Sequence, residues 1–439
     1  MPNMKRNVKL LIIWTALLLA LPAAAQYQED STLIAVEDSL YAEEETDTLP
    51  PPLPWPENLQ ARIDTLLLTK LLDTSDIGLV VWDLTADSCL YAFNPRHRLR
   101  PASTMKAITA ITALDKLGSN YLFRTQLRYK GNIIEYRDTT DAVTGKTFVG
   151  DIWCVGGMDP LFAADDMRAF TNAIRELNVD TIRGNLYADL SFKDKDRLGE
   201  GWCWDDDNPT LSPLLADRKD KFLDKLVQQL RNARIVLDTR QGEQVCPKGT
   251  TELSIRTHTM DEVLKPMMKN SNNLFAECMF YQLANRTGGK WATAKNARTA
   301  VQQVMTKAGI DPKPYYVADG SGLSLYSYLS AEMEVKMLRY AYQNRDIYDH
   351  LYASMPIAGV DGTLSGRMGK TCAARNVHAK TGTVTGVSSL AGFCTAANGH
   401  VLCFSIINQG MQSHAPARAF QDRVCVAMCR AYPLPSGGE

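Results

Sequence analysis

Apolar and polar residues alternate with two different periods along this chain, and the two periods predict strands and helices. β-Branched and aromatic residues dominate residues 78–84 and 89–93, and the short segment between them predicts a β-hairpin. Residues 103–117 are rich in Ala, Ile and Leu and are followed by Gly118, which predicts a helix that ends there. A run of prolines precedes Glu57, so we expect folding to begin near that residue.

The remaining pattern predicts one main domain that is interrupted by a smaller inserted domain. Short strands are predicted at 121–129 and 182–190, separated by Gly and Asp turns. Further helices are predicted at 221–234, 261–268, 273–285, 295–307 and 331–343, further strands at 388–395 and 400–407, and a last helix at 417–432. Because strands lie near both ends, we expect both ends to share one sheet. The expected fold class is α+β, with an antiparallel sheet flanked by helices at 57–120 and 216–437 and the inserted domain at 121–215.

The first 56 residues carry the pattern of an export signal and a tether. Three cations precede a short apolar run at 10–21, and small residues follow it, which is typical of a signal peptide over residues 1–25. Residues 26–56 contain eight acidic residues, no Lys or Arg, and five closing prolines, which predicts a solvated tether. No later apolar stretch has transmembrane length, so we expect an exported, periplasmic protein without a transmembrane segment in its mature chain.

Composition excludes several classes of function. The 439 residues carry a formal net charge of −1, which offers no excess of cations for a phosphate backbone, so nucleic acid is not an expected partner. Six scattered histidines do not indicate a metal cluster, and we expect neither a metal nor a cofactor. The ten cysteines form no Cys-x-x-Cys pair, and several lie in apolar runs, which favours buried free thiols.

A first candidate for chemistry is the pair Ser103 and Lys106 at the start of the predicted helix 103–117. Residues three apart share one face of a helix, so the amine can reach the hydroxyl. A serine hydroxyl needs a base to become a nucleophile, and a lysine can be that base only if burial or another cation lowers its pKa. About one or two Ser-x-x-Lys pairs are expected by chance in a chain of this length, so the pair alone is weak.

A second candidate is the polar turn that contains Ser271 and Asn273, between two predicted helices. It offers another hydroxyl with an amide two residues later. The alternative is that this turn caps the helix that begins near Asn273. Both interpretations can hold together.

The third candidate is Lys380-Thr381-Gly382-Thr383, which precedes a predicted strand. A cation, a hydroxyl and a glycine on an edge strand would let a substrate lie against the backbone while the cation holds its carboxylate. A chance Lys-Thr-Gly is expected on the order of 0.1 times in such a chain, which makes this the most specific of the three.

Together, and in this order, the three motifs resemble those of the penicillin-recognising serine enzymes. The flanking words narrow the resemblance to the class C low-molecular-mass penicillin-binding proteins, which are D-alanyl-D-alanine carboxypeptidases that also act as endopeptidases. These words are Pro101-Ala102-Ser103-Thr104-Met105-Lys106, Asp319-Gly320-Ser321-Gly322-Leu323-Ser324, Gly359-Val360-Asp361-Gly362-Thr363-Leu364, Gly156-Gly157-Met158-Asp159-Pro160-Leu161 and Gly201-Trp202-Cys203-Trp204-Asp205-Asp206. The resemblance covers about residues 75–430 and implies a β-lactamase-like transpeptidase fold.

The resemblance implies a role for each catalytic motif residue. Ser103 would attack the carbonyl of the penultimate D-alanine, and Lys106 would take its proton, kept neutral by burial and by the nearby Lys380 cation. Ser271 would relay a proton to the leaving amine, and Asn273 would orient Lys106 and the substrate amide.

It also implies the substrate-binding residues. Lys380 and Thr381 would hold the terminal carboxylate, and the backbone N–H groups of Ser103 and Thr383 would form the oxyanion hole. Asp189, in the inserted domain, is a further candidate for substrate contact, with the free amine of a diaminopimelate side chain.

Other features favour structural roles or depart from the family. Asp159 is predicted to cap a turn, and Ser321 lacks the outer glycine spacing of a nucleophile elbow. The family usually carries a second inserted domain after the Trp-x-Trp-Asp-Asp word, whereas here the chain passes from Asp207 to the predicted helix 221–234 with little room for one. We therefore expect a smaller insertion than usual.

The function that follows is an exported serine-type D-alanyl-D-alanine carboxypeptidase or endopeptidase. It would act on peptidoglycan stem peptides through a Ser103 acyl-enzyme and would be acylated by β-lactams. The alternatives are a β-lactamase and a catalytically silent protein that binds muropeptides as a sensor.

Overall fold

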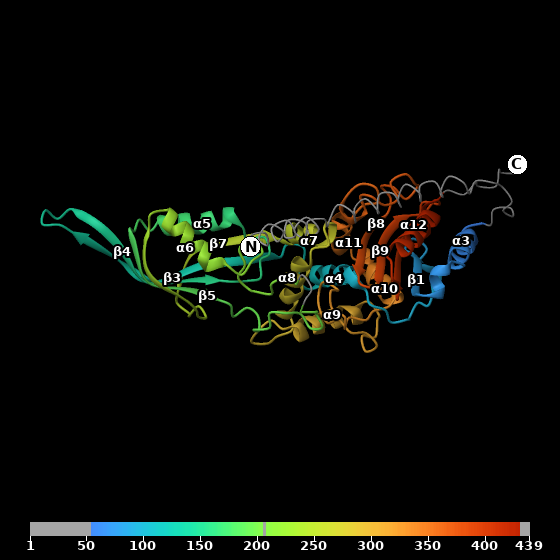
Figure 1. The fold of residues 1–439 in the computed structure, drawn as a ribbon, viewed down its shortest axis with the longest axis horizontal. Helices are drawn as coiled ribbons and strands as arrows, with labels where there is room; N and C mark the ends of the chain where they lie inside the picture. Colours follow the sequence, from blue (N-terminus) through green and yellow to red (C-terminus); the bar gives the residue numbers. More distant parts are fainter. Residues whose placement is uncertain (1–53, 205–207, 431–439) are drawn as a thin grey trace, which may run out of the picture. The chain divides into compact units, whose positions relative to one another are not determined.

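The computed structural model describes residues 54–204 and 208–430 of the chain (Figure 1). The predicted signal peptide and the predicted tether up to residue 53 lie outside the described residues. Within the described part, no helix combines the length and the apolar character needed to cross a membrane.

A five-stranded antiparallel sheet joins the two ends of the described chain. It is built from β1 (Asp76–Asp83), β2 (Ser88–Phe93), β8 (His378–Val384), β9 (Val387–Thr395) and β10 (Val401–Gln409). The strand order is β2-β1-β10-β9-β8, so the N-terminal hairpin pairs directly with the C-terminal strand β10. This confirms the predicted hairpin and the prediction that both ends of the chain share one sheet.

Helices cover both faces of this first sheet, because successive side chains of a strand point to opposite faces. On β1, Leu79 and Val81 pack with α3 (Glu57–Leu67) and α12 (Ala415–Cys429), whereas Val80 packs with the helices of the other face. That other face holds α4 (Met105–Leu117), α7 (Met260–Lys269), α8 (Asn273–Ala284), α9 (Ala294–Lys307), α10 (Ala331–Gln343) and α11 (Arg345–Ser354). Short 3₁₀ turns lie at η1 (Lys70–Asp73), η2 (Ala102–Thr104) and η3 (Gly362–Leu364). The result is the α+β fold expected from the sequence.

A second five-stranded sheet lies between α4 and α7 in the sequence (Figure 1). Its strands are β3 (Leu122–Arg137), β4 (Val143–Val155), β5 (Thr181–Asp189), β6 (Val236–Glu243) and β7 (Thr251–Thr259), in the order β6-β5-β4-β3-β7. β5 runs parallel to β4 and β6, and β3 runs antiparallel to β4 and β7. Helices α5 (Ala164–Arg175) and α6 (Phe222–Asn232) cover one face and close a separate apolar core.

The second sheet extends beyond residue 215, where the predicted insertion ends. Helix α6 and strands β6 and β7 belong to it, although residues 216–259 were assigned to the main domain on sequence. We therefore propose that the inserted domain spans residues 121–259. The strands escaped prediction because β6 and β7 have no fully buried face and alternate among exposed and half-buried residues.

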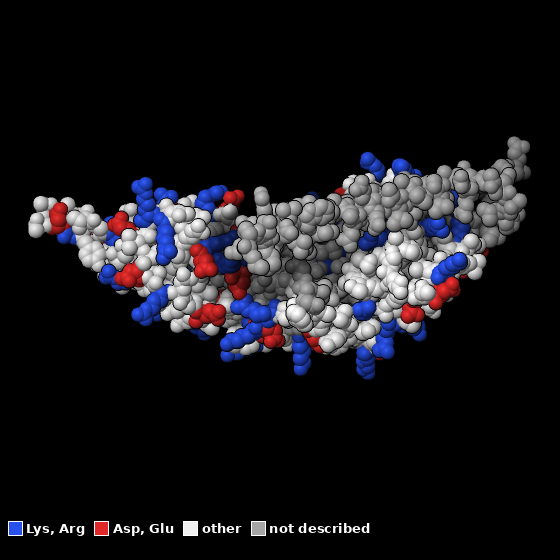
Figure 2. Space-filling view, in the orientation of Figure 1, with Lys and Arg blue, Asp and Glu red and all other residues white. Residues whose placement is uncertain are grey.

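The surface and the cysteines agree with the composition. On the visible face in Figure 2, Lys and Arg side chains are interspersed with Asp and Glu over the described residues. All ten cysteines of the chain lie in the described part, and all are free thiols. Six of them are buried, among them Cys394 and Cys403 in the central strands, as the apolar runs predicted.

Candidate active site

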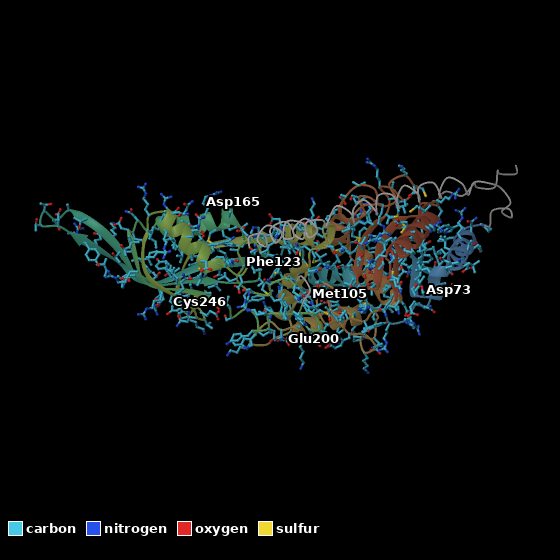
Figure 3. All side chains as sticks on the ribbon, in the orientation of Figure 1. Asp73, Met105, Phe123, Asp165, Glu200 and Cys246 are labelled. Carbon is cyan, nitrogen blue, oxygen red and sulfur yellow. The ribbon has the colours of Figure 1, made fainter. Side chains whose placement is uncertain are left out.

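The turn that carries Ser103 is held in a conformation that its neighbours impose. Ser103 lies in the 3₁₀ turn η2, and this turn ends directly before Met105, the first residue of α4 (Figure 3). Ala102 adopts a φ of +49°, which is uncommon for a residue with a Cβ. Gly322 packs directly against this turn, since a Cβ on Gly322 would lie 1.8 Å from the carbonyl oxygen of Ala102. Backbone strain of this kind is typical of functional sites.

The amine of Lys106 lies behind the Ser103 hydroxyl. Its Nζ is 2.7 Å from Ser103 Oγ, 2.8 Å from Asn273 Oδ1 and 2.9 Å from the carbonyl oxygen of Ser321. The Lys106 side chain is 0% exposed, whereas Ser103 is half-buried. The hydroxyl is therefore open to a substrate, and the amine that contacts it is shielded from water.

Burial changes the proton affinity of Lys106. It lowers the pKa of Lys106 to about 7, because the charged ammonium loses its hydration, while the charges of Asp319 and Glu277 act in the opposite direction. A lysine with such a pKa is substantially neutral near neutral pH, and a neutral amine can accept a proton from a hydroxyl.

The second turn brings Ser271 and Asn273 to the same place. Ser271 has a φ of +54° between α7 and α8, and Asn273 is the first residue of α8. Asn272 caps that helix, since its side-chain oxygen accepts a hydrogen bond from Phe275 N at 3.3 Å. The cap therefore falls on Asn272, which leaves the Asn273 amide free to contact Lys106.

Strand β8 supplies the third group of residues. Lys380 is 0% exposed, and its Nζ donates to Ser271 Oγ at 2.8 Å and to the carbonyl oxygen of Thr381 at 2.7 Å. Burial, and then the charge of Lys106, lower the pKa of Lys380 well below its usual value. Thr383 is exposed farther along the strand.

Gly382 explains how close this strand comes to the nucleophile. A Cβ at Gly382 would lie 2.1 Å from Ser389 Oγ and 2.9 Å from both the backbone nitrogen of Ser103 and the carbonyl oxygen of Pro101. Only a residue without a side chain allows β8 to pack against the Ser103 turn in this way. The structure thus brings together five predicted residues from separate segments: Ser103 from η2, Lys106 from α4, Ser271 from the turn before α8, Asn273 from α8 and Lys380 from β8.

Comparison with known proteins agrees with this geometry. The model of the D-Ala-D-Ala carboxypeptidase 3 (S13) family matches residues 59–217 and 210–428. The chain belongs to this S13 family. Membership confirms the resemblance to a low-molecular-mass penicillin-binding protein and the predicted enzyme class, a D-Ala-D-Ala carboxypeptidase.

Individual relatives of the S13 chain are similar over most of its length. It is 27% identical to a D-alanyl-D-alanine carboxypeptidase of Actinomadura sp. over 87% of this chain and 86% of the relative. It is 26% identical to the D-alanyl-D-alanine carboxypeptidase DacB of Haemophilus influenzae, over 77% of this chain and 86% of the relative.

Solved structures show the same fold. The crystal structure of penicillin-binding protein 4 from Haemophilus influenzae has a TM-score of 0.73 and 22% identity, covering 84% of this chain and 98% of that one. The complex of that protein with a β-lactam has a TM-score of 0.70 and covers 84% and 99%.

Several contacts near this site were not predicted from the sequence. Thr363 lies beside Thr381, with their hydroxyl oxygens 2.7 Å apart. Ser321 was considered on sequence only as a possible nucleophile and was assigned a structural role. It contacts Lys106 through its backbone carbonyl, and its side chain donates to Asp319 Oδ2 at 3.2 Å. Glu277 was detectable as an acidic residue within the apolar pattern of the predicted helix 273–285, because such a residue is rarely buried without a specific partner.

Asp189 lies apart from this group, at the end of β5 in the second sheet. It is 3% exposed, and its two oxygens accept backbone hydrogen bonds from Ser191 at 2.9 Å and Cys246 at 2.8 Å. These bonds give it a structural role, and its contact with a substrate stays a prediction. Asp159 accepts from Leu161 N at 3.0 Å, as expected for a turn cap, and lies 2.7 Å from His258 Nδ1.

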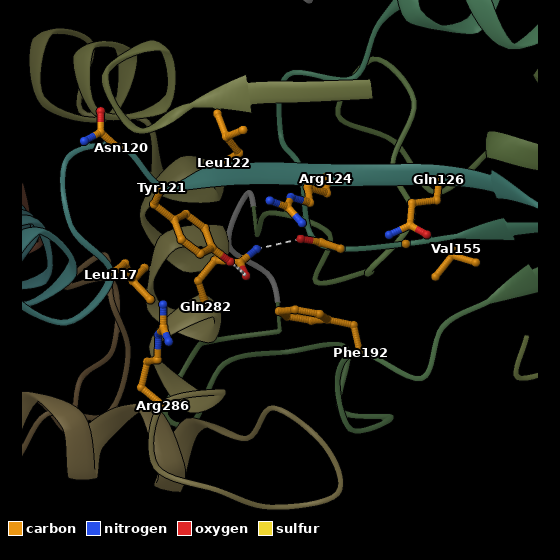
Figure 4. A pocket seen from close by; sticks show the side chains of 12 residues that line it. Leu117, Asn120, Tyr121, Leu122, Arg124, Gln126, Val155, Phe192, Gln282 and Arg286 are labelled. Carbon is orange, nitrogen blue, oxygen red and sulfur yellow. Dashed lines mark hydrogen bonds between the residues drawn. The ribbon is translucent and has the colours of Figure 1, made fainter. Parts of the chain in front are cut away.

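A pocket of about 610 Å³ lies at the C-terminal end of α4, away from Ser103 at the other end (Figure 4). Tyr121 Oη donates to Gln282 Oε1 at 2.7 Å, and Gln282 Nε2 donates to the carbonyl oxygen of Gly157 at 2.6 Å. The first bond ties α8 to the segment before β3, and the second ties α8 to the turn after β4. The predicted catalytic residues do not line this pocket.

Proposed function

We propose that this chain hydrolyses the D-alanyl-D-alanine end of peptidoglycan stem peptides through an acyl-enzyme on Ser103. The observation that carries the proposal is the shared environment of Lys106, whose amine lies within 2.8 Å of both Ser103 Oγ and Asn273 Oδ1 with no exposure to solvent. The S13 family, whose members are named for this substrate, supports the choice of substrate.

Acylation begins when neutral Lys106 accepts the hydroxyl proton of Ser103. Ser103 Oγ then bonds to the carbonyl carbon of the penultimate residue, and the backbone N–H groups of Ser103 and Thr383 stabilise the negative oxygen. The C–N bond breaks, and the leaving amine of D-alanine receives the proton from Lys106 by way of Ser271. Water next attacks the ester carbonyl and its proton passes to Lys106. The ester bond to Ser103 Oγ then breaks, and Lys106 gives that proton to Ser103 Oγ, which restores the hydroxyl and the neutral amine.

Lys380 and Thr381 bind the terminal carboxylate in this proposal. The low pKa of Lys380 in the free site has a consequence for binding. An opposite charge favours the charged form of an amine, so an incoming carboxylate raises the pKa of Lys380. Lys380 therefore takes up a proton when the substrate binds. The same charge on Lys380 disfavours a second charge on Lys106, which keeps the base neutral while substrate is bound.

Residues 1–25 support export to the periplasm, where stem peptides occur, and the β-lactam complex of penicillin-binding protein 4 supports β-lactams as inhibitors. A β-lactamase is the near alternative and differs in the rate at which an acylated penicillin is released. A silent muropeptide-binding protein is the other alternative, and the contact of Lys106 with Ser103 argues against it.

Labelling with a fluorescent penicillin tests the proposal. The wild type should form a persistent adduct on Ser103, located by mass spectrometry, and should release D-alanine from a peptide that ends in D-Ala-D-Ala. Ser103→Ala should abolish both, whereas Ser324→Ala, a matched hydroxyl that bonds the carbonyl oxygen of Glu200, should keep both. An adduct on another residue, or release of the penicillin within seconds, would reject the proposed function.

A further inference from the structure

Glu277 is a buried acidic residue next to the site. It lies on α8, four residues after Asn273, so the two side chains project from the same face of the helix. Its side chain is 1% exposed, and within residues 54–204 and 208–430 no salt bridge is formed by it. A buried carboxyl without a cation is costly, and its position therefore needs an explanation.

The hydrogen bonds of Glu277 go to the loop that contacts Lys106. Oε1 of Glu277 accepts from the backbone nitrogens of Gly320 at 3.1 Å and Ser321 at 2.8 Å. The carbonyl oxygen of the same Ser321 accepts from Lys106 Nζ at 2.9 Å. A single residue of the loop thus joins the carboxyl of Glu277 to the amine of Lys106.

The loop is also fixed against both helices. A Cβ at Gly320 would lie 2.4 Å from Phe280 Cβ and 2.8 Å from the carbonyl oxygen of Ala276, so the backbone lies directly on α8. Thr109 Oγ1, on α4, donates to the carbonyl oxygen of Gly320 at 2.7 Å. The position of the Ser321 carbonyl is therefore set by contacts from α4 and α8 and by the carboxyl of Glu277.

Asp319 is the second buried acid here, and its surroundings differ from those of Glu277. It accepts hydrogen bonds from Trp202 Nε1 at 2.8 Å, Ser324 N at 2.8 Å, Gly322 N at 3.0 Å, Ser321 Oγ at 3.2 Å and Ser327 Oγ at 3.4 Å. Donors on both oxygens stabilise its negative charge. Oε2 of Glu277, by contrast, accepts a long bond from Gly320 N at 3.4 Å and can carry a proton.

We infer that Glu277 is a positioning residue for the catalytic base: its carboxyl holds the loop that keeps the Ser321 carbonyl on the amine of Lys106. This inference rests on the proposed function and assigns to Glu277 the placement of its base.

The direction of the effect follows from the Ser321 carbonyl. Lys106 is faced by the acids Glu277 from α8 and Asp319 from the loop, and by the amine of Lys380 from β8. Burial, and then the charge of Asp319, raise the pKa of Glu277 to about 8, so its carboxyl is largely protonated at the pH where Lys106 becomes neutral. A carbonyl oxygen held on the amine favours the ammonium form of Lys106, so loss of that acceptor lowers the pKa of Lys106. Cys278 and Tyr281 also face Glu277, and their pKa values are raised.

Glu277→Ala is the decisive variant, because it removes the acceptor of the two backbone bonds, and Glu277→Gln is the rescue variant, because its amide oxygen can keep them. Glu334→Gln is the matched control. Glu334 is likewise 1% exposed, but it accepts from Thr104 Oγ1 at 2.6 Å and Ser405 Oγ at 2.7 Å, and its charge is not among those that act on Lys106. The rate of acylation by a fluorescent penicillin is measured from pH 5 to 9 in the wild type and all three variants, each checked for a cooperative thermal transition.

We expect the acidic limb of the Glu277→Ala profile to move down by about 1 pH unit relative to the wild type, with the limbs of Glu277→Gln and Glu334→Gln unmoved. At pH 5.5, for a base of pKa about 7, this shift raises the rate relative to its plateau about eightfold. An unmoved limb in Glu277→Ala, or an equal shift in Glu277→Gln, would overturn the inference. Absence of Ser103 acylation in the wild type would instead reject the proposed function, so the two failures are distinguishable. If Glu277→Ala does not fold, the limb is measured on Glu277→Asp, where an unchanged limb and an unchanged plateau would together overturn the inference.

Discussion

Replacing Lys380 with alanine removes the cation that we propose holds the substrate carboxylate. The side chain is 0% exposed, so its bond to a bound carboxylate would be shielded from water and from salt. A hydrogen bond to a charged group of this kind contributes about 1.5 to 3 kcal/mol. We therefore expect Lys380→Ala to lower kcat/KM for a D-Ala-D-Ala peptide by roughly tenfold to a hundredfold.

The loss can exceed this range, because Lys380 also acts on the base. With substrate bound, loss of the charge of Lys380 lets the pKa of Lys106 rise, so that less of Lys106 is neutral at a given pH. Ser271 also loses the donor that lies 2.8 Å from its oxygen, although a half-buried hydroxyl can bond water in its place.

A substrate whose terminal carboxylate is amidated separates the two effects. The release of D-alanine or of its amide is followed for both peptides with the wild type and with Lys380→Ala, at a pH on the plateau of each profile. If Lys380 binds the carboxylate, the amide is already a poor substrate and loses less through the substitution than the acid does. An equal penalty on both peptides would refute the carboxylate role and leave Lys380 acting only through Lys106 or the fold.

Three further predictions follow from the same contacts. Since burial lowers the pKa of Lys106 to about 7, the wild-type acylation rate at pH 6 should be about one tenth of its plateau value. An acylation rate that does not change from pH 5.5 to 8 would exclude Lys106 as the base. Gly382→Ala places a Cβ 2.1 Å from Ser389 Oγ, so we expect a destabilisation of about 1 to 3 kcal/mol in thermal melts and at least a tenfold slower acylation. Normal acylation kinetics would show that β8 need not contact the Ser103 turn. Burial raises the pKa of Glu334 to about 7 from an ordinary 4.5, so the folded chain keeps a proton there that the unfolded chain has released, and stability falls by about 3 kcal/mol as pH rises from 4.5 to 7. Glu334→Gln should remove this part of the pH dependence in denaturant titrations, and an unchanged slope would contradict the assignment.

Much of the first sheet and its helices was predictable because their signals are local. The hairpin of β1 and β2 shows apolar runs separated by a turn, and α4 ends at Gly118, whose φ of +85° suits a residue without a Cβ. The strand β10 was predicted for the same reason, since an apolar run buried on both faces needs no knowledge of its partners.

The strands β6 and β7 were missed because their information is not local. Their sequences are polar, and they become strands by pairing with β5 and β3, which supply the backbone partners. For that reason we propose a boundary of the inserted domain at 259, whereas the sequence pattern predicts one at 215.

The features of the site likewise divide into those that the sequence pattern predicts and those that depend on tertiary contacts. The motifs predicted Ser103, Lys106, Ser271 and Lys380 as site residues, because a hydroxyl with a nearby amine can be recognised from the spacing of residues along the chain. The low pKa of Lys106 depends instead on burial by three separate segments, and the Ser321 carbonyl and the carboxyl of Glu277 reach it only when α4, α8 and the intervening loop are packed. The sequence by itself determined which reactive groups are present and in what order. The tertiary structure decided their protonation, because water is excluded and charges meet only where residues distant in the chain come into contact.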